Sequence, residues 1–260
     1  MQAQNRLSVS PLHGMPLFAP GMSVAAELVA AMLREGDVVR NCDIVVVAQK
    51  IVSKAEGRLV RLADVVPGEV ARQLASATGR EPEMAQLILD ESSEILRSTP
   101  AAIIARHRTG HVLANAGIDA SNVEGGDGGT VLLWPQDPDA SARAIRAEIA
   151  GLTGHRPAVV VADSLGRAWR IGTVGAAIGC AGLCVLDDRR GTGQDLFGRT
   201  LQATVIAVAD AVAAAAVLAM GEGAEGTPAA LVRGGEHWVT DEDGPGAASA
   251  LRPQAEDMFR

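Results

Sequence analysis

Apolar positions along this chain alternate between helical spacing and short continuous runs. Over residues 23–34 they recur at intervals of three and four after a serine, which predicts a helix with Ser23 as its N-cap. Residues 43–48 (DIVVVA) form a nearly continuous β-branched run, the pattern of a strand buried on both faces. Lys50 and Lys54 lie in the segment that leaves the C-terminal end of this strand.

The same alternation continues along the chain. We predict helices over residues 67–77, 83–96 and 140–152, and strands over residues 101–105, 130–133 and 158–161. A Gly/Ala-rich stretch over 172–182 permits close backbone packing, and residues 201–220 predict an entry segment followed by an alanine-dense helix. Strands that alternate with helices indicate a mixed α/β fold.

Composition excludes several classes of protein. The net charge is −8 and no basic stretch with interleaved aromatic residues is present, so a nucleic-acid partner is not expected. The N-terminus lacks the pattern of a secretion signal, and the apolar run over 211–220 is shorter than the ~20 residues that a membrane helix needs. Three cysteines inside apolar runs suit reduced thiols. We expect a cytoplasmic protein without a membrane partner.

Lysine occurs only at positions 50 and 54, whereas the other Lys/Arg positions are arginines. An ammonium is a compact point charge that fits among phosphate oxygens, so this pair is a candidate phosphate site. Chance is the alternative. In an acidic chain, an anionic substrate would also need bound cations.

Two motifs carry candidate metal ligands. Asp119 and Asn122 lie three apart in a turn-forming segment, where a carboxylate and an amide could face one ligand, although an Asx-turn is the alternative. Asp163 and Ser164 close an apolar strand, and strand ends are where open α/β sheets bind ligands. A helix N-cap is the alternative there. Arg167 and Arg170 follow and could contact an anion.

Two further segments are weaker signals by themselves. Residues 220–228 (MGEGAEGTP) bring glycines that could admit phosphates, although the acidic residues would then require an intervening cation, and a C-cap turn is the alternative. Residues 13–17 (HGMPL) form a turn that could lie against a flat base. Paired zinc-ligand spacings and the GxSxG, Walker A and GxGxxG motifs are absent from the sequence.

Taken together, five segments resemble the coenzyme F420-0:L-glutamate ligase family: AQKIVSKAEGR (48–58), ANAGIDASNV (114–123), DSLGRAWRIGTVGAAIGCAGL (163–183), DLFGRTL (195–201) and MGEGAEGTPAALVRG (220–234). The resemblance covers residues 12–235, which it implies to be the catalytic region with two intimate subdomains. It leaves a flexible N-terminus over 1–11 and a loose polar tail over 236–260. It also implies an unusual two-part α/β ligase fold and an intertwined homodimer.

The family resemblance implies a GTP-dependent ligase that requires Mg²⁺ or Mn²⁺ as two ions, with K⁺ as a further candidate. Such an enzyme adds L-glutamate to the lactyl carboxylate of F420-0, then further γ-linked glutamates, through an acyl phosphate, and it releases GDP and phosphate. The implied metal ligands are Asp119, Asp163, Ser164 and Glu222, with Glu225 as the alternative to Glu222. The implied GTP-binding residues are Gly14, Met15, Pro16, Leu17, Gln49, Lys50, Lys54, Asn122, Met220, Gly221, Glu222, Gly223, Ala224, Glu225, Gly226 and Thr227.

Lys54, Arg167 and Arg170 are the candidate catalytic residues, because positive charge would stabilise a transferring phosphoryl group. Two alternatives stay open. One is a metal-dependent phosphotransferase or nucleotide hydrolase that uses the same site, and the other is a non-catalytic nucleotide-binding oligomer.

Overall fold

The computed structural model of the chain describes residues 6–123, 125–126 and 129–257. The helices are α1 (Val24–Arg34), α2 (Gln49–Ala55), α3 (Glu69–Thr78), α4 (Pro82–Asp90), α5 (Pro138–Thr153) and α6 (Val208–Met220). The strands are β1 (Ser8–Pro11), β2 (Ile44–Ala48), β3 (Leu59–Arg61), β4 (Ser92–Ser98), β5 (Ile103–His107), β6 (Val112–Ala114), β7 (Thr130–Leu132), β8 (Ala158–Arg167), β9 (Arg170–Ala181), β10 (Leu186–Asp188), β11 (Val205–Ala207) and β12 (Ala229–Arg233).

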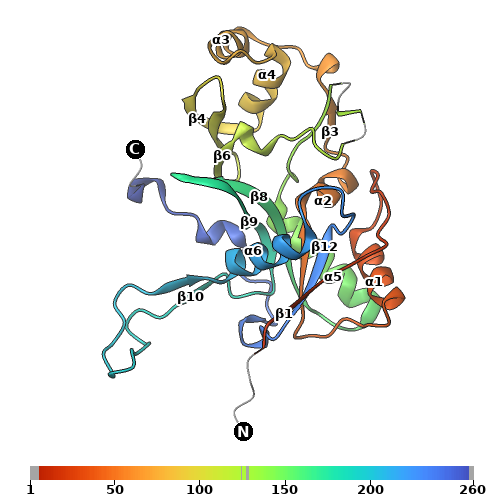
Figure 1. Ribbon diagram of the computed structural model, residues 1–260, viewed down its shortest axis with the longest axis vertical. Coiled ribbons are helices and arrows are strands. Elements are labelled where there is room, and N and C mark those ends of the chain that lie inside the picture. Colours follow the sequence, from red (N-terminus) through yellow and green to blue (C-terminus); the bar gives the residue numbers. More distant parts are fainter. Residues whose placement is uncertain (1–5, 124, 127–128, 258–260) are drawn as a thin grey trace.

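A five-stranded sheet with the order β1-β12-β2-β8-β9 forms the centre of the molecule (Figure 1). Strands β2 and β8 run parallel, with Ile44 opposite Ala158 and Ala48 opposite Ala162, and the other neighbours are antiparallel. Alternate side chains of β2 and β8 enter two different hydrophobic clusters, so both strands are buried on both faces. The mixed α/β class is confirmed.

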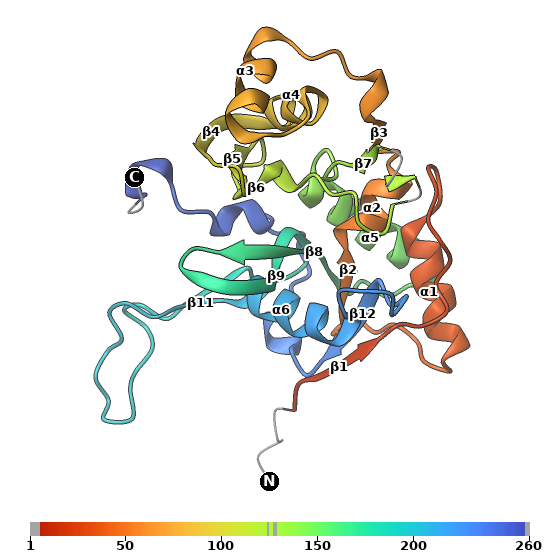
Figure 2. The same cartoon turned by 45° about the horizontal axis from the view of Figure 1, so that its top comes forward.

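Helices cover both faces of this sheet. Helices α1 and α5 pack on one face and α6 packs on the other (Figure 2). The Ser23 hydroxyl accepts a hydrogen bond from the Ala26 N–H, so the predicted N-cap of α1 is confirmed. Helix α5 begins at Pro138 after the Asp137 cap and ends at Gly154, whose φ of 74° is the left-handed conformation that glycine adopts easily.

A second lobe lies between β2 and β8 in the sequence. It contains α3, α4, the β4-β5-β6 sheet and the β3-β7 pair, and it has its own buried cluster that includes Ile88, Ile103 and Val131. In Figure 1 this lobe stands above the central sheet. The sheet is thus packed by two hydrophobic clusters, one on each face, and the lobe has separate clusters of its own, one of them between α3 and α4.

One predicted helix is partly wrong. We expected a single helix over 83–96, whereas α4 ends at Asp90 and residues 92–98 form β4, which pairs with β5. The apolar pair Ile95 and Leu96 fits either pattern, and pairing with a neighbouring strand decides the conformation. The strand expected over 158–161 continues to Arg167, because residues beyond Asp163 pair with β9.

The described parts of both chain ends are more ordered than predicted. We expected a flexible segment over 1–11, but residues 8–11 form β1 at the sheet edge. We expected a loose tail over 236–260, but the buried Arg146 side chain donates to the Thr240 and Asp241 carbonyls and to the Asp243 carboxylate. Those predictions also include residues 1–5 and 258–260, which lie outside the described residues, as do residues 124, 127 and 128.

Across the described ranges, none of the helices has both the length and the apolar character that crossing a membrane requires.

Candidate functional site

Most of the candidate residues lie at the edge of the central sheet where the parallel strand β2 ends and β8 loses contact with it. Helix α2, which carries Lys50 and Lys54, begins directly after β2. In the parallel pair of β2 and β8 the last paired residues are Ala48 and Ala162, and Asp163 follows directly after Ala162. Residues 220–228, here called the glycine-rich loop, lead into the start of β12, and Ala229 lies opposite Val47 at this same edge. The backbone topology therefore unites segments that are far apart in sequence.

The turn after β1 reaches this edge as well. The Leu12 N–H donates to the Ala229 carbonyl at 2.8 Å, so residues 13–17 leave the sheet beside the glycine-rich loop. Gly14 has a φ of 65° and its carbonyl accepts from Arg34 at 2.9 Å. Leu17 is 92% exposed. Contact of this turn with a planar base stays a prediction.

Asp119 anchors the loop that crosses over α2. Its backbone pairs with Leu132, and its carboxylate accepts from the Ser121 N–H at 2.7 Å and from the Ser121 hydroxyl at 2.8 Å. The Asx-turn interpretation is thus correct for the local contacts. The same carboxylate also pairs with the Lys50 ammonium at 2.7 Å. Both predicted roles of the motif, turn and ligand, are compatible with this geometry.

The two lysines hold this loop from below. Besides Asp119, the Lys50 ammonium contacts the Ser121 hydroxyl at 2.5 Å and the Ser121 carbonyl at 3.2 Å. The Lys54 ammonium donates to the Asn122 carbonyl at 2.7 Å. Asn122, which has a φ of 54°, donates from its side-chain amide to the Gly223 carbonyl at 3.2 Å. The loop with Asp119 and the glycine-rich loop are therefore in direct contact.

Asp163 lies in a more enclosed position. Burial raises its pKa to about 6, while hydrogen bonds from the Ser164 N–H and the Trp134 indole act in the opposite direction. Lys50 lowers and Asp119 raises the pKa of Asp163, so the three charges are close enough to interact. Burial also opposes ionisation of Asp119, but hydrogen bonds from Lys50 and Ser121 hold its pKa below the ordinary value.

The glycine-rich loop separates the roles of its two glutamates. The Ser164 hydroxyl donates to the Glu222 carboxylate in a very short contact. Glu225 instead accepts from the Gly223 N–H at 2.7 Å, within its own loop. Thr227 is buried and its hydroxyl donates to the Met220 carbonyl at 2.5 Å, which closes the loop. Glu222 is therefore the glutamate that lies beside the predicted metal ligands.

Three predicted site residues are not part of this group. Arg167 and Arg170 lie opposite each other in the backbone register at the tip of the β8–β9 hairpin. This tip is about 13 Å along the strand from Asp163, at a rise of about 3.3 Å per residue. Arg167 donates to the Ile171 carbonyl at 3.2 Å. Gln49 is 2% exposed and accepts from the Ser53 hydroxyl at 2.9 Å, so its side chain faces the core and not the site.

Two further contact residues escaped the sequence analysis. Ser121 is part of the quoted IDASN segment, and its hydroxyl beside Asp119 could have been considered from spacing alone. Trp134 follows a predicted strand and donates from its indole Nε1 to Asp163 Oδ2 at 2.8 Å. A tryptophan after an apolar run is typical of a core residue, so the pattern gave no sign of this role.

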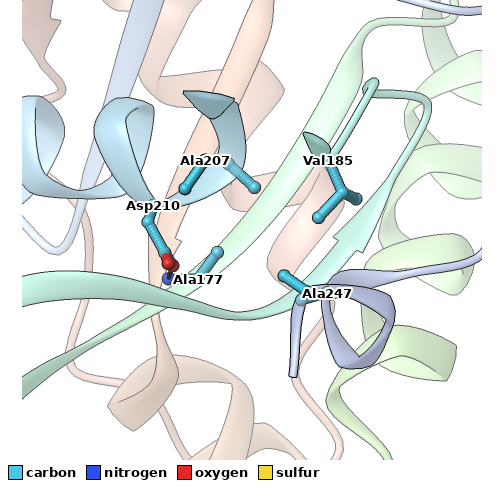
Figure 3. A pocket seen from close by; sticks show the side chains of 7 residues that line it. Ala177, Val185, Ala207, Asp210 and Ala247 are labelled. Carbon is cyan, nitrogen blue, oxygen red and sulfur yellow. Dashed lines mark hydrogen bonds between the residues drawn. The ribbon is translucent and has the colours of Figure 1, made fainter. Parts of the chain in front are cut away.

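Two cavities lie elsewhere in the molecule. A small hollow between α6, β9 and the turn at 247–250 is lined mostly by alanines, and Asp210 accepts there from the Ala177 N–H at 2.9 Å (Figure 3). A wider cleft is lined by residues that include Arg108, His111 and Arg143. Neither of these two cavities is lined by Asp119 or Asp163.

Comparisons with known proteins identify relatives of this chain. The family model described as F420-0:Gamma-glutamyl ligase matches residues 14–234. The chain is 42% identical to a coenzyme F420:L-glutamate ligase of Methanothermobacter thermautotrophicus, over 98% of this chain and 99% of the relative. It is 42% identical to the protein of that name from Archaeoglobus fulgidus, over 98% and 97%. For the Methanopyrus kandleri protein of that name the identity is 43%, over 90% of each chain.

The matched range contains every predicted metal-binding and nucleotide-binding residue, from Gly14 to Thr227. The chain therefore belongs to the F420-0:gamma-glutamyl ligase family and is a ligase.

Proposed function

We propose that this chain adds L-glutamate to coenzyme F420-0, and then further γ-linked glutamates, at the expense of GTP. The observation that carries the proposal is the convergence of Asp119, Asp163, two lysines and a glycine-rich loop at one sheet edge. The printed names of the relatives, each a coenzyme F420:L-glutamate ligase, support the choice of acceptor and amino acid.

The reaction requires an activated acid, because an amine does not displace hydroxide from a carboxylate at neutral pH. In the proposed sequence, a carboxylate oxygen of the acceptor attacks the γ-phosphorus of GTP, and the bond to the GDP oxygen breaks. The amine of glutamate then attacks the acyl carbon, phosphate leaves, and the amine loses its proton. Catalysis of such a transfer rests mainly on positioning and charge stabilisation.

The residues fit Mg²⁺ or Mn²⁺ that is shared with a nucleotide. Mg²⁺ usually takes one or two carboxylates together with water and phosphate oxygens. Asp119 and Asp163 would hold one ion, and Ser164 with Glu222 would help to hold a second. Within the described ranges, no group of three or more His, Cys, Asp or Glu side chains is arranged to hold an ion. The proposal therefore needs phosphate oxygens of the nucleotide as further ligands.

The surroundings of Asp163 also favour a cation. Because burial disfavours its ionised form, a positive charge nearby would stabilise that carboxylate. When bound, such an ion would neutralise phosphate charge and polarise the transferred phosphoryl group. The Lys50 ammonium already contacts Asp119 at 2.7 Å, so this carboxylate accommodates positive charge at that distance.

The chain's own residues would orient the nucleotide. Lys50 and Lys54 project from α2 toward the loop over 119–122, where a phosphate could take over contacts that Ser121 and Asn122 now make. The backbone amides of the glycine-rich loop could approach phosphate oxygens closely. Gly221 and Gly226 have positive φ angles, which favour glycine, and glycine has no side chain that would keep a phosphate away. Lys54 remains the candidate for charge stabilisation during transfer.

The direct test incubates the purified protein with GTP, Mn²⁺, L-glutamate and F420-0, and follows GDP by chromatography and the acceptor by mass spectrometry. We expect one GDP for each glutamate residue added. Asp119→Asn and Asp163→Asn should abolish both products. Asp64→Asn is the matched control, because Asp64 pairs with Arg61 on the exposed surface and its loss should leave turnover unchanged. No heavier product with the wild-type protein would refute the proposal.

The rival reactions give different results in the same assay. GDP release that does not depend on glutamate would support a phosphotransferase or hydrolase. Full activity of both Asn variants would show that the reaction does not depend on these two carboxylates. Nucleotide binding without any product, in wild type and in both variants, would support a non-catalytic protein in which these loops serve packing alone. Replacing GTP by ATP in parallel reactions tests the nucleotide, which rests on the family resemblance only.

We also propose that two copies of the chain associate. The segment between β10 and β11 projects from the body (Figures 1 and 2), and it carries Leu196 and Phe197 with exposed fractions of 100% and 84%. Trp169 and Ile171 at the β8–β9 tip are 81% and 101% exposed. Large exposed apolar side chains at projecting tips are typical of contact surfaces. Sedimentation of wild type should give a dimer, and Leu196→Ser with Phe197→Ser should shift it toward monomer.

A further inference from the structure

Trp134 is the largest completely buried side chain in the described part of the chain, and it contacts a candidate metal ligand. Its indole Nε1 donates to Asp163 Oδ2 at 2.8 Å. An indole N–H can only donate, so this nitrogen cannot coordinate a cation, but it fixes the direction of the carboxylate that it contacts. Ligating carboxylates are commonly held by such outer hydrogen bonds.

The indole ring is confined on several sides. The ring centroids of His107 and His111 lie 5.0 Å and 5.5 Å from that of Trp134. A Cβ atom at Gly117 would lie 2.5 Å from the indole Nε1, so the ring packs directly on that backbone. The Trp134 carbonyl accepts from the Arg58 Nε at 2.9 Å. A ring held in this way cannot rotate its N–H away from Asp163 without moving its neighbours.

The supporting contacts lead to a buried ionic cluster. Glu91, whose side chain is 7% exposed, pairs with Arg58 at 2.8 Å and with Arg108 at 3.0 Å. His107 Nε2 lies 3.4 Å from the same carboxylate. His107 and His111 both contact the Thr109 hydroxyl at 2.9 Å. The second lobe thereby supplies a rigid support for the ring that reaches the sheet edge.

We propose that Trp134 is a positioning residue, which holds the Asp163 carboxylate in the orientation that binds a divalent cation. This inference rests on the proposed function only in that Asp163 is a metal ligand. Asp163 stands where β8 passes from its fully buried part to its half-buried part, and an unsupported side chain there could adopt other rotamers. The indole contact removes that freedom before a cation binds, so binding does not have to restrict the side chain.

The test measures Mn²⁺ binding in the absence of nucleotide and substrates, by electron paramagnetic resonance of the free ion. Loss of an outer hydrogen bond typically weakens metal affinity about 10- to 100-fold, and we expect Trp134→Phe to raise the Kd for Mn²⁺ by about that factor. The matched control is Trp238→Phe, which makes the same chemical change in the cluster on the opposite face of the sheet. It should leave the Kd unchanged.

A double-mutant cycle separates positioning from a general loosening of the core. If Trp134 acts through Asp163, Trp134→Phe should have little effect on the Kd for Mn²⁺ in an Asp163→Asn background. An equal effect in both backgrounds, or a folded Trp134→Phe protein with wild-type affinity, would overturn the inference. Should Asp163→Asn alone leave Mn²⁺ affinity unchanged, the metal site of the proposed function fails instead.

A second replacement covers the case in which Trp134→Phe does not fold. The chain has three tryptophans, so a Trp169→Phe/Trp238→Phe background leaves position 134 as the only one. Replacing that indole by its benzothiophene analogue exchanges the N–H for sulfur with little change in shape. Weaker Mn²⁺ binding in the analogue protein than in its indole parent supports the inference, and equal binding contradicts it.

Discussion

Gly117→Ala should destabilise the protein strongly, through two separable effects. Gly117 has a φ of 73°, and a left-handed conformation costs a residue with a Cβ atom about 1–2 kcal/mol. The new Cβ would also lie 2.5 Å from the Trp134 Nε1 and 2.6 Å from its Cε2, well inside ordinary contact. Overpacking of this kind costs about 1–3 kcal/mol, so the total is about 2–5 kcal/mol.

Neither partner in this clash can move easily. Trp134 is confined by Arg58 and two histidines, and the residues before Gly117, Asn115 and Ala116, already have φ angles of 52°. The segment therefore has little freedom to turn the new methyl group away. Because Asp119 follows two residues later and Trp134 contacts Asp163, the substitution should also disturb the candidate site.

Gly79→Ala is the matched control for the backbone effect. Gly79 ends α3 with a φ of 67°, and no atom lies within 4 Å of the position that its Cβ would take. Urea denaturation, followed by circular dichroism and tryptophan fluorescence, gives the free energy of unfolding of both variants. We expect Gly79→Ala to lose about 1–2 kcal/mol and Gly117→Ala to lose about 1–3 kcal/mol more. Equal losses would refute the argument that Trp134 is tightly packed on Gly117.

Two further predictions concern the acidic residues of the site. In EDTA at pH 8, Asp163→Asn should be more stable than wild type. The pKa of Asp163 in the folded state, about 6, lies above the ordinary 3.8, so ionisation of this carboxyl opposes folding by about 3 kcal/mol at high pH. This cost becomes progressively smaller as the pH falls through 6 toward 4. Thermal unfolding of the wild type and the variant at pH 8 and at pH 4 checks this. A stability difference between the two proteins that does not depend on pH would contradict it. Glu222→Gln should weaken Mn²⁺ binding in the presence of GTP, because Glu222 contacts Ser164, whereas Glu225→Gln should weaken it less, since Glu225 bonds within its own loop. Calorimetric titration of both variants measures the difference, and the reverse order would assign the metal to Glu225.

Elements whose pattern depends on local burial were predictable from the sequence. The β2 run is apolar on both faces because it lies between two hydrophobic clusters, and Ser23 caps α1 through a contact that spans three residues. Segments whose conformation depends on a distant partner were less predictable. Residues 92–98 become β4 only because β5 lies beside them, and β8 extends past Asp163 because β9 pairs with it.

The candidate site shows the same division. Asp119, Asp163 and the glycine-rich loop could be named from local motifs and the family resemblance, and the structure brings them to one edge. The placement of Arg167 and Arg170 at a hairpin tip follows from the length of β8 and β9, which the apolar pattern did not reveal. The contact between Trp134 and Asp163 joins residues 29 apart through the packing of two lobes, and no spacing rule describes it.

Strand β1 has a practical consequence for handling the protein. It pairs with β12 from Ser8 to Pro11, and the turn over 13–17 continues from it. Removing residues 1–11 would leave the polar backbone atoms of β12 exposed along one side, and an unpaired edge strand is a template for aggregation. Versions of the protein that are shortened or fused at the N-terminus, and that disturb these four residues, should therefore precipitate even though every side chain of the candidate site is still present.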